Sequence, residues 1–195
     1  MTDRSDERLL SAYRKGDIEA FETLLHRYRI PLFNVVLRSV RDRGRAEEIY
    51  QDVWMRVIER AGDFRGDAKY STWLYAIARN QCIDHQRKMK FRRHASLDAT
   101  RDPDSASLAD RLADGGPSTE RLAAGRRMQE RIAAAVETLP DDQREVFLLR
   151  QLQGMPFAEV AEIVGVSVPT AKSRMRYALE RLQRALADWR RPNEL

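Results

Sequence analysis

The strongest constraint on the fold is a break between two helical patterns at residues 157–175, FAEVAEIVGVSVPTAKSRM. Ala161 is small enough for the point where two helices cross, Gly165 permits a sharp turn, and Ser167 can cap the helix that follows. Pro169 falls in the first turn of that helix, where a missing N–H costs little. The segment therefore predicts a helix-turn-helix.

The second helix of this pair has an apolar side and a polar side when its residues are placed about 100° apart. The apolar side holds Ala171, Met175, Ala178, Leu179, Leu182 and Leu186. The candidate DNA-binding residues of this helix are Thr170, Ser173, Arg176 and Tyr177 on its polar side, together with Lys172 and Arg174 at the flanks. Small polar side chains at its start would let the helix enter a major groove, where the cations can contact phosphates or a guanine edge.

A basic amphipathic helix can also be a solvated surface helix or a helix that lies on a membrane. The small residues and the proline of the turn disfavour the first alternative, because a surface helix does not need them. The apolar side carries no Trp or Phe before Trp189, which disfavours the second alternative. Duplex DNA is therefore the favoured ligand.

The remainder of the chain also has helical patterning. Residues 6–91 place apolar side chains at helical spacing. Gly and Pro occur only at isolated positions, and no pattern typical of a β-strand is present. Apolar residues make up 43% of the chain and charged residues 33%, which is typical of a folded helical protein. We predict an all-α fold with two small helical domains, an N-terminal helical bundle and a C-terminal helix-turn-helix domain, joined by a flexible linker.

The composition changes between residues 92 and 125, which are rich in Ala, Ser, Asp, Gly and Pro. This segment has five basic and six acidic side chains, whereas both flanking parts carry more basic than acidic residues. We therefore expect domains at residues 1–91 and 126–195, with the linker at 92–125. The net charge of the whole chain is only +5, so binding to a polyanion depends on where the positive charge clusters.

A second candidate for nucleic-acid binding lies at residues 63–93, DFRGDAKYSTWLYAIARNQCIDHQRKMKFRR. Residues 79–93 hold six basic side chains against one acid, Asp84. Aromatic rings stack on unpaired bases at about 1 to 3 kcal/mol each while cations follow the backbone, so this segment suits a single strand. The alternative is that Trp73 and Tyr75 are core aromatics and that the basic run is a solvated helix end.

Several functional classes are disfavoured by the sequence. Cys82 is the only cysteine, which excludes an intramolecular disulfide or a Cys-only metal site and favours a reducing compartment. We find no Gly-rich phosphate loop, no metal-ligand spacing and no nucleophile partner for the three histidines, so we expect neither an enzyme nor a cofactor. The polar start and the short apolar runs predict a cytoplasmic protein without membrane insertion.

Three stretches together resemble the bacterial RNA polymerase sigma factors of the extracytoplasmic function (ECF) type, within the sigma-70 family. They are AEEIYQDVWMRVIER, FRGDAKYSTWLYAIARNQCIDHQRK and LPDDQREVFLLRQLQGMPFAEVAEIVGVSVPTAKSRMRYALERL, in the family's order. The resemblance covers nearly the full length. It implies a protein that binds core RNA polymerase and directs promoter-specific transcription initiation, with residues 1–91 as sigma region 2 and 126–195 as region 4.

The resemblance also implies a role for each stretch. In the family the first docks on the clamp helices of the core polymerase, which implies polymerase binding by Glu48, Asp52, Val53 and Arg56. The second opens the minus-10 promoter element and captures single-stranded DNA. The implied contacts are Phe64, Arg65, Lys69, Ser71, Trp73, Asn80, Asp84, Arg87 and Lys88. The last stretch reads the duplex minus-35 element and sits on the polymerase flap, and an anti-sigma factor is the further partner that the family implies.

This chain departs from many members of the family by having Tyr177 and Leu179 where they continue the last helix with arginines. Its minus-35 base preference therefore does not follow from the family. The rival interpretation is a stand-alone helix-turn-helix repressor or activator, which normally dimerises on a palindrome. Residues 46–91 discriminate between the two, because a simple regulator has no use for a second, strand-opening module.

Overall fold

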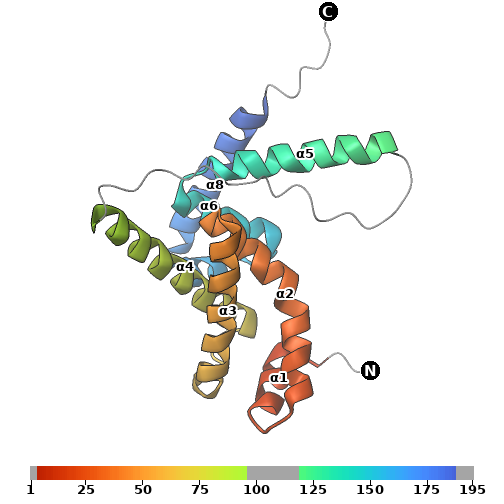
Figure 1. Cartoon of the computed structure of the whole chain (residues 1–195), viewed down its shortest axis with the longest axis vertical. Coiled ribbons are helices and arrows are strands. Elements are labelled where there is room, and N and C mark those ends of the chain that lie inside the picture. The colour runs from red at the N-terminus through yellow and green to blue at the C-terminus, as the bar shows by residue number, and fades with distance from the viewer. Residues whose placement is uncertain (1–3, 96–118, 188–195) are drawn as a thin grey trace, which may run out of the picture.

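The computed structural model describes residues 4–95 and 119–187, and all regular structure in these ranges is helical (Figure 1). The all-α prediction is therefore confirmed. No helix within this part of the chain has the length and apolar character that crossing a membrane requires. The same ranges contain no group of three or more His, Cys, Asp or Glu side chains placed to hold a metal ion.

Residues 4–95 form a bundle of four α-helices. They are α1 (Asp6–Tyr13), α2 (Ile18–Val40), α3 (Arg43–Arg60) and α4 (Tyr70–Ala95), with a 3-10 turn at Ala61–Asp63 before α4. The first three begin where a short polar side chain accepts a backbone N–H of the first turn. These capping residues are Ser5, Asp17 and Asp42.

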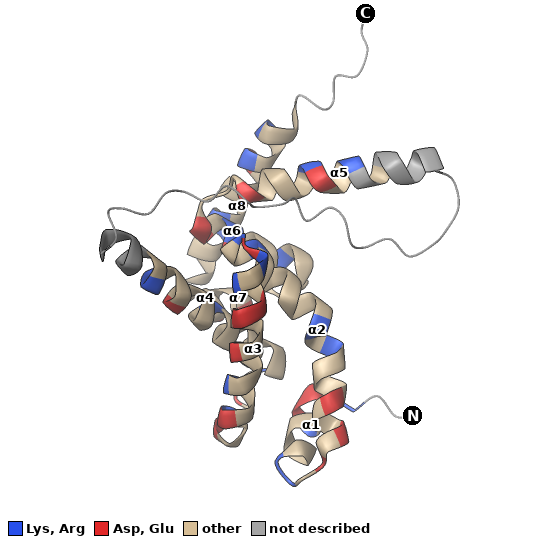
Figure 2. Ribbon diagram, in the orientation of Figure 1, with Lys and Arg blue, Asp and Glu red and all other residues tan. Residues whose placement is uncertain are grey.

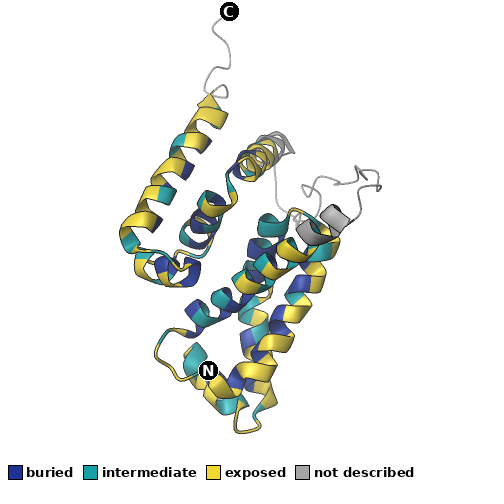
Figure 3. Ribbon diagram, turned by 90° about the vertical axis from the view of Figure 1, so that its left-hand side faces the viewer, coloured by how far each residue is buried: buried dark blue, intermediate teal, exposed yellow. Residues whose placement is uncertain are grey.

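The core of this bundle forms where the apolar sides of the four helices meet. Its fully buried side chains include Leu10, Leu24, Leu32, Val36, Val53 and Leu74. On α4, Leu74 and Ala78 are buried whereas Asn80 and Asp84 are exposed, and Figure 3 shows the same division along the other helices. Residues three or four positions apart share one side of a helix, so burial of the first set turns the second toward solvent.

The C-terminal part consists of four α-helices and one π-helical turn within residues 119–187. They are α5 (Thr119–Glu137), α6 (Asp141–Phe147), the turn at Leu148–Leu152, α7 (Phe157–Val164) and α8 (Val168–Ala187).

Both ends of the expected linker at 92–125 are helical, because α4 continues to Ala95 and α5 begins at Thr119. The start of α5 is rich in Ala, Leu, Arg and Glu, whose high helix propensity outweighs the single Gly125. Residues 96–118 of the expected linker lie outside the described residues.

The N-terminal and C-terminal parts lie against each other. Helix α4 runs beside α7 (Figure 2), and the end of α2 approaches α6 and the π-helical turn (Figure 1). The buried apolar residues of the two parts form one continuous cluster. Polar contacts also cross the boundary: Tyr75 Oη donates to Gln153 Oε1 at 2.6 Å, and Arg79 pairs with Glu145. The contact surface therefore combines apolar burial with polar pairing.

Arg144 of α6 is a buried charged residue at this boundary, with only 3% of its surface exposed. Its guanidinium donates to the carbonyl oxygens of Leu139 at 3.0 Å and Ser39 at 3.4 Å, and it pairs with Asp141 at 2.6 Å. A buried guanidinium is tolerated when its donors find acceptors in this way. Arg144 thereby ties the start of α6 to the end of α2.

The Cys82 thiol is predicted to be unreactive in the native protein. Burial, with a smaller effect of the nearby Glu145 charge, raises the pKa of Cys82 from 9.0 to about 12. At neutral pH this leaves about a thousandfold less thiolate than in an exposed cysteine. Modification by an aromatic disulfide reagent, followed by absorbance, should be slow in buffer and fast in denaturant. Equal rates in the two conditions would contradict the buried position.

Candidate nucleic-acid interface

The helix-turn-helix predicted at residues 157–175 is present as α7, a tight turn and α8. Gly165 ends α7 with a left-handed backbone (φ 69°), a conformation that L side chains rarely adopt. The Ser167 hydroxyl accepts the N–H of Thr170 at 3.3 Å and so caps α8. Ala161 is only 3% exposed, as a small residue between crossing helices should be. The predicted turn is confirmed.

The apolar side of α8 packs onto the rest of the C-terminal part, with one exception. Ala171, Met175, Ala178 and Leu182 are buried, but Leu179 is 48% exposed. The prediction that Leu179 belongs to the apolar side is therefore wrong. Counting about 100° per residue places it about 70° from the centre of the buried stripe, at an edge that faces solvent.

The polar side of α8 is open to solvent. Thr170, Lys172, Ser173, Arg176 and Tyr177 are all exposed, and together they form what we call the α8 face. The Arg176 guanidinium lies over the Tyr177 ring, 4.8 Å from its centroid. Such an exposed contact is weak, so it leaves both side chains available to a ligand.

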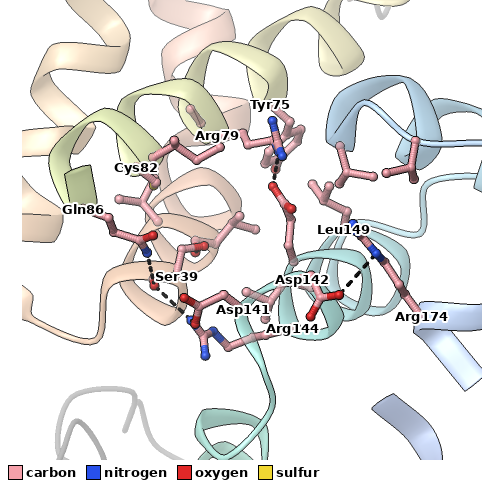
Figure 4. A pocket seen from close by; sticks show the side chains of 18 residues that line it. Ser39, Tyr75, Arg79, Cys82, Gln86, Asp141, Asp142, Arg144, Leu149 and Arg174 are labelled. Carbon is pink, nitrogen blue, oxygen red and sulfur yellow. Dashed lines mark hydrogen bonds and ion pairs between the residues drawn. The ribbon is translucent and has the colours of Figure 1, made fainter. Parts of the chain in front are cut away.

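Arg174 was expected among the DNA-binding residues, but the structure places it away from the α8 face. Its guanidinium pairs with Asp142 of α6 at 3.3 Å. Arg174 also lines a cavity of about 290 Å³ between α4 and the C-terminal helices, beside Arg79 and Glu145 (Figure 4). Burial raises the pKa of Glu145 in this cavity, while the adjacent Arg79 and Arg174 charges lower it. Arg174 thus serves the contact between helices in this arrangement.

Aromatic rings gather where the loop before α4 meets the start of that helix. The rings of Phe64 and Trp73 are 5.4 Å apart, and both pack on Tyr70, which is completely buried. Tyr75 is also buried, at 2% exposed, so the core-aromatic alternative holds for Tyr75. Trp73 is only partly buried, which leaves part of its ring accessible.

The exposed side of α4 continues from this cluster. Trp73 is followed on the same side by four exposed residues, and we call the set the α4 face: Trp73, Asn80, Asp84, Arg87 and Lys88. Arg65 is exposed in the loop that precedes the helix. The structure therefore brings these predicted minus-10 residues onto one surface.

Two further candidates at the start of α4 have different surroundings. Ser71 is half-buried, and the exposed Lys69 has its ammonium 2.7 Å from a carboxylate oxygen of Glu159 on α7. The hydrogen bond to Glu159, together with its charge, raises the pKa of Lys69, which stays protonated at neutral pH. Glu159 is one of the two acidic residues of α7, whose acidic positions are red in Figure 2. Sequence reasoning missed the contact because no local pattern relates residues so far apart in the chain.

The candidate polymerase-binding residues on α3 do not all face outward. Glu48, Asp52 and Arg56 are exposed, whereas Val53 is completely buried. The assignment of Val53 to a docking surface is therefore wrong: it shares the core side of the helix with Val57.

Two apolar residues that sequence reasoning missed lie on the outer side of α3. Met55 is 55% exposed and Ile58 is 41% exposed. Both lie out of phase with the buried positions Ala46, Ile49 and Val53, and this phase difference is the signal that could have identified them. Met55 and Ile58 therefore make the outer side of α3 partly apolar, next to the exposed Glu48 and Asp52.

Two families match this chain, one in each of its two parts. Residues 24–92 match the family described as Sigma-70 region 2, and residues 129–182 match Sigma-70, region 4. A stand-alone helix-turn-helix regulator would have no counterpart of the first match.

Several curated sigma factors align along nearly the whole chain. The ECF RNA polymerase sigma factor SigM of Mycobacterium tuberculosis is 34% identical, over 94% of this chain and 86% of its own length. The RNA polymerase sigma-H factor of Pseudomonas aeruginosa is 27% identical, over 95% and 96%. The ECF RNA polymerase sigma-E factor of Escherichia coli is 29% identical, over 90% and 91%.

Solved structures share the fold. The sigma factor RpoE of Bartonella quintana, crystallised with the anti-sigma factor NepR, gives a TM-score of 0.70 at 24% identity, covering 86% of this chain and 96% of that one. CnrH, in complex with the cytosolic domain of CnrY, gives 0.68 at 22% identity, covering 95% and 99%. Since both sigma regions match in order and SigM aligns at 34% identity, the chain belongs to the family of ECF RNA polymerase sigma factors.

Proposed function

We propose that this sigma factor binds core RNA polymerase through α3, reads the minus-35 duplex with the α8 face and opens the minus-10 element with the α4 face. The supporting observation is that one chain exposes two separate polar and basic surfaces, each on a helix whose other side is buried. We assign residues 1–91 to polymerase binding and strand opening, 92–125 to the linker and 126–195 to duplex reading. Promoter specificity then requires both surfaces to be engaged.

The α8 face has the chemistry for reading a major groove. Thr170 and Ser173 are short polar residues near the start of the helix, where a close approach to base edges is needed. Lys172 and Arg176 can reach phosphates or a guanine, and the Tyr177 ring offers an apolar contact for a thymine methyl group. Arg174 is omitted from this set because Asp142 holds its guanidinium.

The α4 face has the chemistry for holding an extruded base. Extrusion costs a few kcal/mol, and stacking on a ring such as Trp73 returns about 1 to 3 kcal/mol. The Asn80 amide and the Asp84 carboxylate can bond to base edges, while Arg87 and Lys88 are placed for phosphates. Binding to a large polymerase supplies the remaining free energy.

The outer side of α3 fits a protein partner. Met55 and Ile58 are apolar and exposed, and the charged Glu48, Asp52 and Arg56 lie beside them. An apolar centre with a charged rim is typical of a protein interface. We assign this surface to the polymerase clamp helices, and a surface of the C-terminal part to the flap.

An anti-sigma factor is the further partner that we propose, with the cytoplasm as the place of action. The related RpoE was crystallised with the anti-sigma factor NepR, which supports a partner of that class. Reconstitution tests the function as a whole: purified chain is added to bacterial core polymerase, and initiation is mapped on a genomic promoter library. Specific start sites that depend on the chain are expected, and their absence would refute the proposal.

Duplex reading is tested by truncating the long cations of the α8 face. Arg176→Ala or Lys172→Ala should weaken duplex binding by about 1 to 3 kcal/mol if the residue contacts a base, or reduce the salt slope by about one if it contacts phosphate. Binding of the polymerase complex to a promoter duplex, titrated against salt, measures both quantities. Arg181→Ala, at an exposed position further along α8, is the matched control. Equal losses at positions 176 and 181 would argue against the assignment.

Strand opening is tested with Asn80→Ala. The side chain is exposed, so the free energy of unfolding should change by less than about 0.5 kcal/mol. Closed-complex binding should persist, whereas permanganate reactivity of unpaired thymines should fall. A promoter with a premelted minus-10 element should restore initiation, because its base is already unpaired. Equal losses on premelted and duplex templates would contradict a role in opening.

The outer side of α3 is tested by comparing exposed and buried positions. Met55→Glu should abolish co-purification with core polymerase and leave the free energy of unfolding within about 0.5 kcal/mol of wild type. Val53→Ala should lower that free energy by about 1 to 3 kcal/mol, because it opens a cavity in the core. Ile30→Glu makes the same kind of change at a residue 53% exposed on α2, and should retain polymerase binding. Wild-type binding by Met55→Glu would rule out this surface.

A further inference from the structure

The start of α4 is capped by a residue of α1, which lies 63 positions earlier in the chain. The first turn of α4 has no acidic side chain, and the preceding Lys69 carries an ammonium that cannot accept a hydrogen bond. Instead, Glu7 Oε1 accepts the backbone N–H of Tyr70 at 3.1 Å. This bond is the main cause that lowers the pKa of Glu7, so its carboxylate is charged at neutral pH beside the positive end of the helix.

The other end of α1 holds the loop that precedes α4. The Arg14 guanidinium donates to the backbone carbonyl of Phe64 at 3.3 Å. Phe64 and Tyr70 are thus both bound through their main chains to α1 or its C-cap, and the loop lies between these two points. This loop carries Arg65 and Lys69, two of the proposed minus-10 contacts.

Helix α1 is itself fixed to the core of the N-terminal bundle. Leu10 is completely buried, and the Tyr13 ring stacks on Phe21 with 4.7 Å between the centroids. The Asp6 carboxylate accepts a hydrogen bond from the Tyr28 hydroxyl of α2 at 2.5 Å. The helix can therefore act as a fixed support for the loop.

The two residues that α1 holds are the ones that contact the Trp73 ring. The centroid of this ring lies 5.4 Å from that of Phe64 and 5.9 Å from that of Tyr70. Trp73 is the ring proposed to stack on the extruded base, and a site loses affinity when the residues that support it are loose. Helix α1 precedes residues 24–92, the segment that matches Sigma-70 region 2, so this match assigns no role to it.

We propose that Glu7 is a positioning residue for capture of the minus-10 strand: by capping α4 from α1 it fixes Tyr70 and, through it, the ring of Trp73. Arg14 supports the same arrangement at the start of the loop. Loss of the Glu7 carboxylate leaves an N–H in the first turn of α4 without its partner, so the start of the helix becomes less ordered and the ring less well placed. The inference rests on the proposed role of Trp73 in holding a base.

The test uses the full-length chain without polymerase, because a single strand needs no base extrusion before it binds. The probe is a labelled single-stranded oligonucleotide of randomised sequence, whose affinity is measured by fluorescence anisotropy. The chain is also labelled with 5-fluorotryptophan, so that fluorine NMR reports on the surroundings of Trp73. The resonance of this residue is the one that is absent from Trp73→Phe.

The matched control is Asp42→Ala. Asp42 also caps a helix of the N-terminal bundle, because its carboxylate accepts the N–H of Arg45 at 2.9 Å. It lies at the start of α3, whereas the loop before α4 follows the end of that helix. Asp42→Ala therefore removes a similar cap away from the proposed base-holding residues.

Glu7→Ala and Asp42→Ala should lower the urea midpoint of unfolding to a similar extent, because each removes one helix cap. Only Glu7→Ala should shift the Trp73 resonance. It should also weaken single-strand binding about three- to tenfold, a part of what one stacked ring contributes, whereas Asp42→Ala should leave that affinity unchanged. Glu7→Gln keeps an acceptor oxygen and should retain most of the binding.

Because Glu7 acts through Trp73, Glu7→Ala should add little to the loss of binding caused by Trp73→Ala. Additive losses, an unchanged Trp73 resonance in Glu7→Ala, or equal losses of binding in Glu7→Ala and Asp42→Ala would overturn the proposal. Wild-type affinity in Trp73→Ala would overturn both the base-stacking assignment and this inference. If Trp73→Ala weakens binding and Glu7→Ala does not, the inference alone fails and the function proposed for the α4 face stands.

Discussion

Burial of one side of α4 is the constraint on which both halves of the molecule depend. Leu74 and Ala78 enter the N-terminal core, and this fixes the rotation of the helix about its axis. Tyr75 and Arg79 then point to the C-terminal part, where they meet Gln153 and Glu145. The third side is left to solvent. A single helix thus carries a core surface, an internal contact surface and the α4 face.

The boundary between the halves is built from parts of unequal strength. Its centre is an apolar cluster that contains the buried guanidinium of Arg144, which donates to the Leu139 carbonyl and to Asp141. Loss of an acceptor would leave this buried charge unpaired, which would lower the stability of the boundary. Its edge is an ion pair between Glu159 and an exposed lysine, which is weak and screened by salt. The edge is therefore where the two halves hold each other most weakly.

The helix-turn-helix depends on local chemistry in a way that the boundary does not. Gly165 supplies the left-handed residue, and Ser167 supplies the cap for α8. The apolar side of α8 packs against α5, α6 and α7, which all belong to the C-terminal part, so the α8 face does not depend on the N-terminal half for its exposure. Duplex reading can thus be retained while the halves separate.

The sequence by itself determined the all-α fold, the helix-turn-helix and the side of α4 that faces solvent, because helical periodicity, capping and glycine conformation act over a few residues. It did not determine where α4 ends or where α5 begins. It misplaced Val53 and Leu179, since a stripe of apolar residues does not reveal which edge a neighbouring helix will cover. It also could not pair Arg174, which it placed at the flank of the polar side of α8, with Asp142, or pair Lys69 with Glu159. Those partners come from elements far apart in the chain. Only tertiary packing brings such charges within hydrogen-bonding distance, and only there is it decided which of them remain free for DNA.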